Sequence, residues 1–274
     1  MSMIPLNEEQ DIYAAARSQL VTKANELIQK SRFNLTLQQQ KIILYLISQI
    51  SPFDEDFKLY EFSIAEFCRV CGIDAASGKN YDDLKTAIKE IADKSLWIQT
   101  PKGEYTLIRW IEKPYLNTKS GIIKIRLDND MRPYLLQLKA NFTCYELIWT
   151  LHFKSKYTIR LYELVKSIHF HELENYERQY PVDELKRILG GEGYKEYRDF
   201  KRRVLKPSVD EINAYSDKTV EFTEIRQGKK VAMVQFTVST KDSMDRLRIR
   251  SDIEKEMGFE QMTLWETLKE KEMV

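Results

Sequence analysis

The sequence has few cysteines and few glycines, and each shortage argues against a class of protein. Three cysteines, Cys68, Cys71 and Cys144, occur among 274 residues. They cannot form an even disulfide framework, which fits a reducing cytoplasm. The nine glycines are spread thinly, and none is followed by the Lys-Ser/Thr pair of a phosphate-binding loop. The composition therefore favours neither a disulfide-stabilised scaffold nor an ATPase.

Long apolar runs are also absent. The longest, Ile42 to Ile47, is broken by Tyr45, and it is far shorter than the roughly 20 residues that cross a bilayer. The N-terminal region carries Glu8, Glu9 and Asp11, where a signal peptide would be basic and then apolar. We therefore expect a cytoplasmic protein that has no membrane partner.

The composition is that of a soluble globular protein with enough apolar mass for two cores. Hydrophobic residues make up 43% of the chain, and it contains 12 Phe, 15 Tyr and 4 Trp. The formal net charge is only +1, so the total charge does not point to nucleic acid. Basic residues are nevertheless clustered in one window that holds only two acidic ones: Lys195, Arg198, Lys201, Arg202, Arg203 and Lys206. A local cluster can attract DNA even when the total charge is near zero.

The second half of the chain has the element order of a winged helix. The sequence predicts a helix at 154–168, a short strand and helix at 180–189, a basic helix at 194–215 and a β-hairpin at 220–238. The third helix is the most basic, and the hairpin follows it directly. This order is typical of a winged helix, whose third helix enters the major groove.

The first half predicts a coarser version of the same order. Thr36 and Gln39 form a candidate capping box before an apolar helix at 38–50. A strand at 57–62, a short helix at 63–71 and a helix at 81–93 capped by Asn80 follow. Strands at 96–100 and 105–111 flank a turn that forms a candidate wing.

We therefore predict an α+β protein with two tandem winged-helix domains. The predicted division is a helix-prone N-terminal arm (1–30), a first winged helix (31–142), a second winged helix that provides the main DNA contact (143–240) and a charged C-terminal tail (241–274).

The basic helix is the strongest candidate for DNA contact. At about 100° per residue, Arg198, Arg202 and Lys206 fall along one stripe with Lys195 beside it. Phe200 points to the opposite side, as do Tyr197 and Val204. A solvated surface helix would show the same pattern, and the hairpin that follows is what favours DNA recognition. Pro207 should kink the helix.

Lysines mark the remaining candidate contacts. The hairpin places Gln227-Gly228-Lys229-Lys230 at its tip, where Lys229 and Lys230 would meet phosphates. The corresponding residues of the first half are Lys79, Lys85 and Lys89, with Lys102 in the wing. They are sparser, so we expect this half to bind DNA more weakly or to serve protein contacts.

Two motifs suggest metal chemistry instead. His169-Phe170-His171 resembles the metal-binding pair of rolling-circle nicking endonucleases, with Tyr194 or Tyr197 as the nucleophile. His152 is the only other histidine, so a third ligand is not evident. Cys68 and Cys71 lack the second pair that a zinc site needs and are expected to be core thiols. We predict no catalytic residue, no metal and no cofactor, with the nicking enzyme kept as an alternative.

Three segments resemble iteron-binding plasmid replication initiators. They are FKSKYTIRLYEL (153–164), YRDFKRRVLKPSVDEIN (197–213) with the hairpin after it, and NLTLQQQKIIL (34–44). The resemblance covers roughly residues 20 to 240. It implies two winged-helix domains that bind repeated origin sequences, after which the DNA opens and host helicase is recruited.

The resemblance also implies partners and further site residues. Partners would be double-stranded DNA, a second copy of the chain in a monomer–dimer equilibrium, and host replication initiator and helicase proteins. Dimers of the family typically repress their own gene, so a plain winged-helix repressor stays an alternative. Ser155 and Lys156 would contact phosphate at the start of the second domain's first helix, whereas Arg160, Tyr162 and Leu164 would be packing residues.

Overall fold

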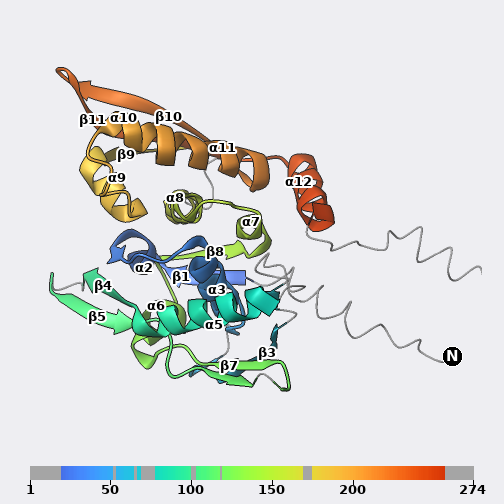
Figure 1. Ribbon diagram of the computed structural model, residues 1–274. Helices are drawn as coiled ribbons and strands as arrows, with labels where there is room; N and C mark the ends of the chain where they lie inside the picture. Colours follow the sequence, from blue (N-terminus) through green and yellow to red (C-terminus); the bar gives the residue numbers. More distant parts are fainter. Residues whose placement is uncertain are drawn as a thin grey trace, which may run out of the picture.

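The computed structural model describes residues 20–51, 54–64, 67–68, 78–99, 103–117, 119–168 and 175–256. The chain forms two halves stacked one above the other, with α8 (Lys156–Ser167) between them (Figure 1). Each half contains helices packed on small antiparallel sheets. This arrangement is the predicted α+β class.

The first half surrounds one almost completely buried helix, α3 (Leu37–Ser48). The predicted capping box is present, because the Thr36 hydroxyl accepts from the Gln39 backbone N–H and the Gln39 side chain accepts from the Thr36 N–H. The other elements of this half are β1 (Leu20–Ala24), α2 (Asn25–Gln29), β2 (Ser31–Arg32), β3 (Tyr60–Ser63), α5 (Gly78–Asp93), β4 (Ser95–Gln99), β5 (Tyr105–Arg109), β6 (Tyr115–Asn117), β7 (Ile122–Ile125), η1 (Asn129–Met131), α6 (Arg132–Leu135) and β8 (Phe142–Glu146). Three sheets result, in the orders β1-β8, β2-β4-β5 and β3-β7-β6.

The helix expected in the N-terminal arm is wrong for residues 20–24. Residues 20–24 form β1, which pairs antiparallel with β8 across more than 110 residues of sequence. Val21 and Lys23 are buried and Leu20 is exposed, which is the alternation of a strand. Residues 25–29 then form α2. The distant partner β8 decides this structure, and no local pattern reveals it.

Other predicted boundaries shift by a few residues. The helix expected from Tyr81 begins at Gly78, so Asn80 lies inside α5 and does not cap it. Before β8, the chain forms a 3-10 turn, η1, and then the one-turn helix α6. Such shifts at helix ends are common, because helix termini fray and often tighten into 3-10 turns.

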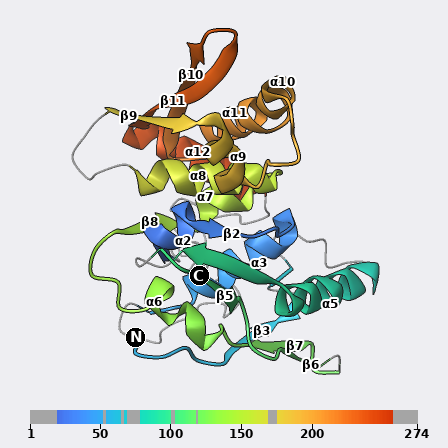
Figure 2. The ribbon, with the colours of Figure 1, turned by 90° about the vertical axis from the view of Figure 1, so that its left-hand side faces the viewer.

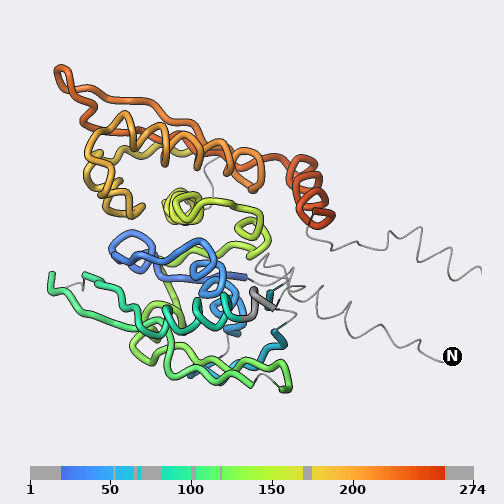
Figure 3. The backbone as a smooth tube through the Cα atoms, in the orientation of Figure 1, coloured from blue at the N-terminus to red at the C-terminus, as the bar shows by residue number. Residues whose placement is uncertain are grey.

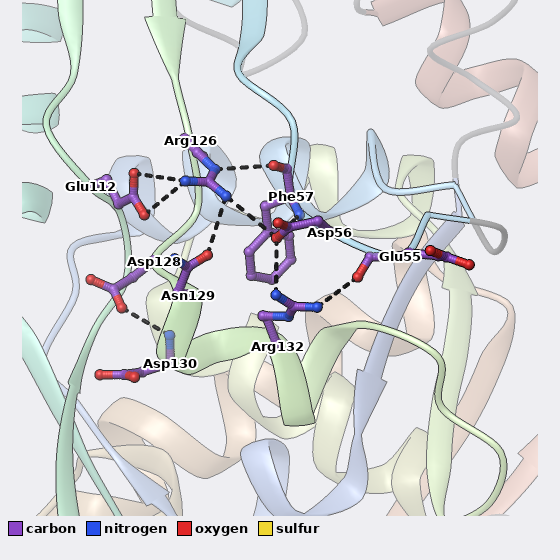
Figure 4. A network of polar contacts seen from close by, with 9 residues as sticks. All are labelled: Glu55, Asp56, Phe57, Glu112, Arg126, Asp128, Asn129, Asp130 and Arg132. Carbon is purple, nitrogen blue, oxygen red and sulfur yellow. Dashed lines mark hydrogen bonds and ion pairs between the residues drawn. The ribbon is translucent and has the colours of Figure 1, made fainter.

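A network around Arg126 fastens the segment before β3 to the end of β7 (Figure 4). The Arg126 guanidinium donates to the Phe57 carbonyl at 3.0 Å and to the Glu112 carboxylate at 3.2 Å. Arg132 binds the same segment through the Glu55 carbonyl at 2.8 Å. Residues 54–59 form neither helix nor strand, and these contacts hold them in place.

The second half has the predicted order of a winged helix. Its elements are α7 (Ile148–Leu151), α8, β9 (Asn175–Pro181), α9 (Val182–Leu189), α10 (Tyr197–Phe200), η2 (Lys201–Leu205), α11 (Lys206–Tyr215), β10 (Lys218–Gln227), β11 (Lys230–Thr240) and α12 (Ser243–Glu256). The sheet order is β10-β11-β9. In the predicted charged tail, α12 packs through Ile249 and Ile253.

Pro207 does not end the basic helix. The segments α10, η2 and α11 run as one helix in Figure 3, and η2 is a π-helical turn that ends at Leu205, two residues before the proline. Pro207 has no N–H to give to a carbonyl one turn back. The backbone widens instead, and the Lys206 N–H bonds to the Lys201 carbonyl, five residues back. The expected kink is thus taken up by the π turn.

Helix α8 presents buried polar groups to both halves. Toward the first half, Glu163 accepts from Lys23 at 2.5 Å and from the Tyr145 hydroxyl at 2.6 Å. Toward the second half, the Tyr162 hydroxyl and the Lys166 ammonium donate to Asp217, at 2.7 and 2.9 Å. Because α8 belongs to both cores, the division at residue 142 stays a prediction.

The Asp217 carboxylate should make the free energy of unfolding depend on pH in the acidic range. Burial alone would raise the pKa of Asp217, but the charge and hydrogen bond of Lys166 outweigh it and hold the pKa below its ordinary value of 3.8. A carboxylate whose pKa is lowered on folding stabilises the protein above its unfolded pKa, and the contribution is lost as pH falls through the folded pKa. We expect Asp217→Asn to lower the free energy of unfolding by about 3 kcal/mol at neutral pH.

Urea denaturation at a series of pH values measures this effect. The variant should lose less stability than the wild type as pH falls below 3.8. Asp252→Asn removes an exposed carboxylate on α12 and is the matched control. Equal acid sensitivity of Asp217→Asn and the wild type would contradict the assignment.

Candidate nucleic-acid interface

The turn before the basic helix is built from two glycines and a buried lysine. Gly190 ends α9 in the left-handed conformation, at φ 74°. A Cβ added at Gly191 would lie 2.7 Å from the Phe200 ring, so only glycine fits under the helix there. Lys186, buried on α9, donates to the Lys195 carbonyl at 2.9 Å. These contacts fix where the basic helix begins.

The basic helix buries its apolar face as predicted. Phe200, Val204 and Leu205 are completely buried. The cationic residues on the opposite side are exposed: Lys195, Arg198, Arg202, Arg203 and Lys206. The π turn widens the helix between 201 and 205, so the exposed cations spread over a broader face than the predicted single stripe.

The cations differ in their partners. Arg202 is paired with Asp199 at 3.0 Å and Lys206 with Asp210 at 2.8 Å, and both pairs are largely exposed. Arg198 and Arg203 make no ion pair within the described part of the chain. Two arginines on this face are therefore available to an external acceptor without breaking any contact.

Lys201 differs from the exposed cations of the basic helix, because its side chain packs against the hairpin. It is half-buried, donates to Glu224 of β10 at 2.6 Å and lies over the Phe222 ring. This geometry ties the basic helix to the hairpin, a contact that sequence reasoning missed because it spans 23 residues.

The hairpin carries the predicted basic tip. Gln227 pairs with Lys230, so Gly228 and Lys229 form a two-residue turn in which Gly228 has φ 62°. Lys229 and Lys230 are exposed, and the tip projects beyond the body of the second half (Figure 1). Arg226, beside the tip, is also exposed and lies 3.6 Å from Glu224. The sequence analysis did not single out Arg226, although its position directly before the predicted turn could have indicated a further basic residue near the tip.

The first half presents α5 on the same side of the molecule as α10 (Figure 2). Lys85 and Lys89 are exposed on α5, and Lys89 is paired with Asp93 at 2.7 Å. Lys79 lies in the first turn of α5. Lys102 lies outside the described residues.

Ser155 and Lys156 are engaged at the junction of the two halves. The Ser155 hydroxyl caps α8 by accepting from the Tyr157 N–H at 3.2 Å. The Lys156 ammonium donates to the Asn34 side chain of the first half at 2.9 Å. Partial burial and the nearby charge of Lys94 lower the pKa of Lys156. In the structure, both side chains make hydrogen bonds within the protein. Their contact with phosphate stays a prediction.

The structure does not test the two candidate metal-binding motifs, because most of their residues lie outside the described ranges. His169, His171 and Cys71 lie outside the described residues. Cys68 is buried in the first half, and burial raises the pKa of its thiol. Within the described ranges, no group of three or more His, Cys, Asp or Glu is placed to hold a metal ion. No helix there is long and apolar enough to span a bilayer.

Two family models match the chain in sequence order. One, described as the first winged helix (WH1) of initiator replication proteins, matches residues 20–166, and the other, their second winged helix (WH2), matches residues 181–238. A replication initiation protein from Escherichia coli is 27% identical over 234 residues, which are 82% of this chain and 71% of that protein.

A solved structure shares the fold. The Pi initiator protein, determined in complex with iteron DNA, superposes with a TM-score of 0.69 at 18% identity, covering 83% of this chain and 99% of that one. The two winged-helix matches, in the order in which the structure places the two halves, show that the chain belongs to the family of initiator replication proteins.

Proposed function

We propose that the chain binds repeated DNA sequences at a plasmid replication origin and starts replication there. The helix 197–215 lies in the major groove, the hairpin tip contacts the adjoining phosphates, and α5 adds contacts from the first half. The observation that carries the proposal is the pair of exposed, unpaired arginines, Arg198 and Arg203, on a helix followed directly by a basic hairpin. Family membership and the iteron DNA bound by the Pi initiator protein support it.

The chemistry of the exposed face suits base readout. An arginine guanidinium donates two parallel hydrogen bonds to O6 and N7 of guanine, the commonest specific contact in the major groove. The ion pairs of Arg202 and Lys206 are exposed, and such pairs contribute at most about 1 kcal/mol. DNA can therefore replace Asp199 and Asp210 as their partners at little cost.

The two halves contribute unequally. Of the α5 lysines whose side chains are described, only Lys85 lacks an ion pair, so the second half supplies most of the binding energy. A first half joined to it on one chain engages its own contacts at a high effective concentration, which raises the total affinity.

The remaining steps follow from the resemblance to plasmid initiators. Binding at several repeats opens the DNA through binding energy, since the sequence has no phosphate-binding loop for ATP. Host initiator and helicase proteins then join, and a second copy of the chain acts in repression of its own gene. Footprinting on DNA flanking that gene, followed by replication of the same DNA with the protein supplied in trans, tests the function. Binding without replication would favour the plain repressor.

Arg202 should contribute to base readout. We expect Arg202→Ala to weaken binding to the repeat by about 1–3 kcal/mol and to relax the sequence preference. Gel-shift titrations at fixed salt on repeat and single-base variants measure both. Arg248→Ala is a matched control, because Arg248 makes the same i,i+3 ion pair with Asp245 on α12. Unchanged affinity and preference in Arg202→Ala would refute the assignment.

The hairpin tip should contribute phosphate contacts without base readout. Lys229→Ala combined with Lys230→Ala should weaken binding to repeat and random duplex alike. The slope of log K against log salt should flatten by up to about two units, since each phosphate contact releases about one counterion. Arg248→Ala with Lys255→Ala removes two exposed cations from α12 as the control. A loss confined to the repeat would contradict a phosphate role.

A further inference from the structure

Arg160 of α8 is buried at the junction of the two halves. Its Nη2 donates to the Ile188 carbonyl at 2.7 Å and to the carbonyls of Ile28 and Ser31, both at 3.3 Å. Its Nε donates to Ile188 as well, at 3.1 Å. The guanidinium also lies over the Phe33 ring, 4.2 Å from its centre. One side chain thus joins three segments that are far apart in sequence.

The accepting carbonyls explain why a buried cation is stable there. Arg160 makes no ion pair among the described residues. Ile28 lies in the last turn of α2 and Ile188 in the last turn of α9. Carbonyls at a helix C-terminus lack intrahelical donors and carry partial negative charge, so they favour a cation. The guanidinium satisfies the ends of two helices, one from each half.

The end of α9 leads directly into the turn that starts the basic helix. Gly190 lies beside the first half, since a Cβ added there would be in ordinary van der Waals contact with the Phe33 carbonyl, at 3.9 Å. On the other side of the same turn, Gly191 lies against the Phe200 ring and Lys186 holds the Lys195 carbonyl. The contacts run from the first half through Arg160 to α9, and from α9 to the basic helix.

We infer that Arg160 is a positioning residue for DNA binding, which fixes the basic helix relative to the first half and so sets the spacing between the two DNA contacts. The consequence for DNA spacing rests on the proposed function. The fixed arrangement of the two halves is independent of the proposed function, and it can be measured without DNA.

The first test measures the distance between the halves in the free, full chain. Spin labels at Asp83→Cys on α5 and Ala214→Cys on α11 report it by pulsed electron paramagnetic resonance. Cys71→Ser, Cys144→Ser and Cys68→Ala remove the other thiols. We expect one narrow distance distribution with Arg160 present, and a broad or second distribution in Arg160→Met.

Two further variants separate positioning from stability. Lys166→Met removes another α8 cation, but one whose partner Asp217 belongs to the second half. It should lower stability without broadening the distribution. Arg160→Lys keeps the charge on a side chain that is one bond shorter, so we expect it to keep the bond to the Ile188 carbonyl and to lose those to Ile28 and Ser31. The Arg160→Lys variant should fold and should broaden the distribution of distances between the spin labels. It takes the place of Arg160→Met in the test if Arg160→Met does not fold. Narrow distributions in the Arg160 variants would overturn the inference.

The second test uses DNA repeats with one to three base pairs inserted between the regions protected by each half. The wild type should lose affinity with each insertion. Arg160→Met, or Arg160→Lys in its place, should bind the native repeat about 10²-fold more weakly and be nearly insensitive to insertion. An insertion penalty equal to that of the wild type would overturn the positioning role. Failure of the wild type to bind any repeat would reject the proposed function and leave the distance test intact.

Discussion

The arrangement of the two halves depends on a buried guanidinium that binds carbonyls of both. Arg160 is 5% exposed, and burial lowers its pKa to about 10, so it keeps its charge at neutral pH. Three backbone carbonyls and an aromatic face replace the water it has lost. Removing a buried charge of this kind leaves carbonyls without donors, which costs more than a surface ion pair contributes. The hydrogen bonds of Arg160 therefore favour one particular arrangement of the two halves, because they are satisfied only in that geometry.

The same chemistry recurs at two other helix ends. Lys41 of α3 donates to the Leu151 carbonyl at the end of α7, at 2.5 Å. Lys241 donates to the carbonyls of Asn213, Ser216 and Lys218 around the end of α11, each within 2.8 Å. In each case a cation satisfies a carbonyl in the last turn of a helix, that of Leu151 or of Asn213, which the helix itself leaves free. These two lysines thus connect separate elements of the fold.

The sequence predicted local order better than long-range pairing. The order of the second half, the Thr36 capping box and the Gly228 turn follow from residues that are neighbours in the chain, and the structure confirms them. Strand β1 was missed because its partner β8 lies more than 110 residues away. Pro207 was expected to kink the helix, whereas the backbone absorbs the missing N–H in a π turn. The resemblance implied that Arg160 is a packing residue, and it is buried. Its bonds to the ends of two helices, like the bond of Lys201 to Glu224, are tertiary contacts without a local signal.

A net charge of +1 is compatible with DNA binding because of how the charges are distributed. Three acidic residues near the basic helix are engaged: Asp199 and Asp210 with exposed cations, and Glu224 with Lys201. The Lys201–Glu224 pair holds the hairpin on the helix, so it should persist when DNA binds, whereas the exposed pairs can exchange partners. In the binding mode that we propose, contact with DNA begins at Arg198 and Arg203 and at the hairpin lysines, which need no exchange of partners. Since screening at physiological salt limits the reach of exposed charges to about 8 Å, acidic residues far from this face should not weaken the proposed attraction.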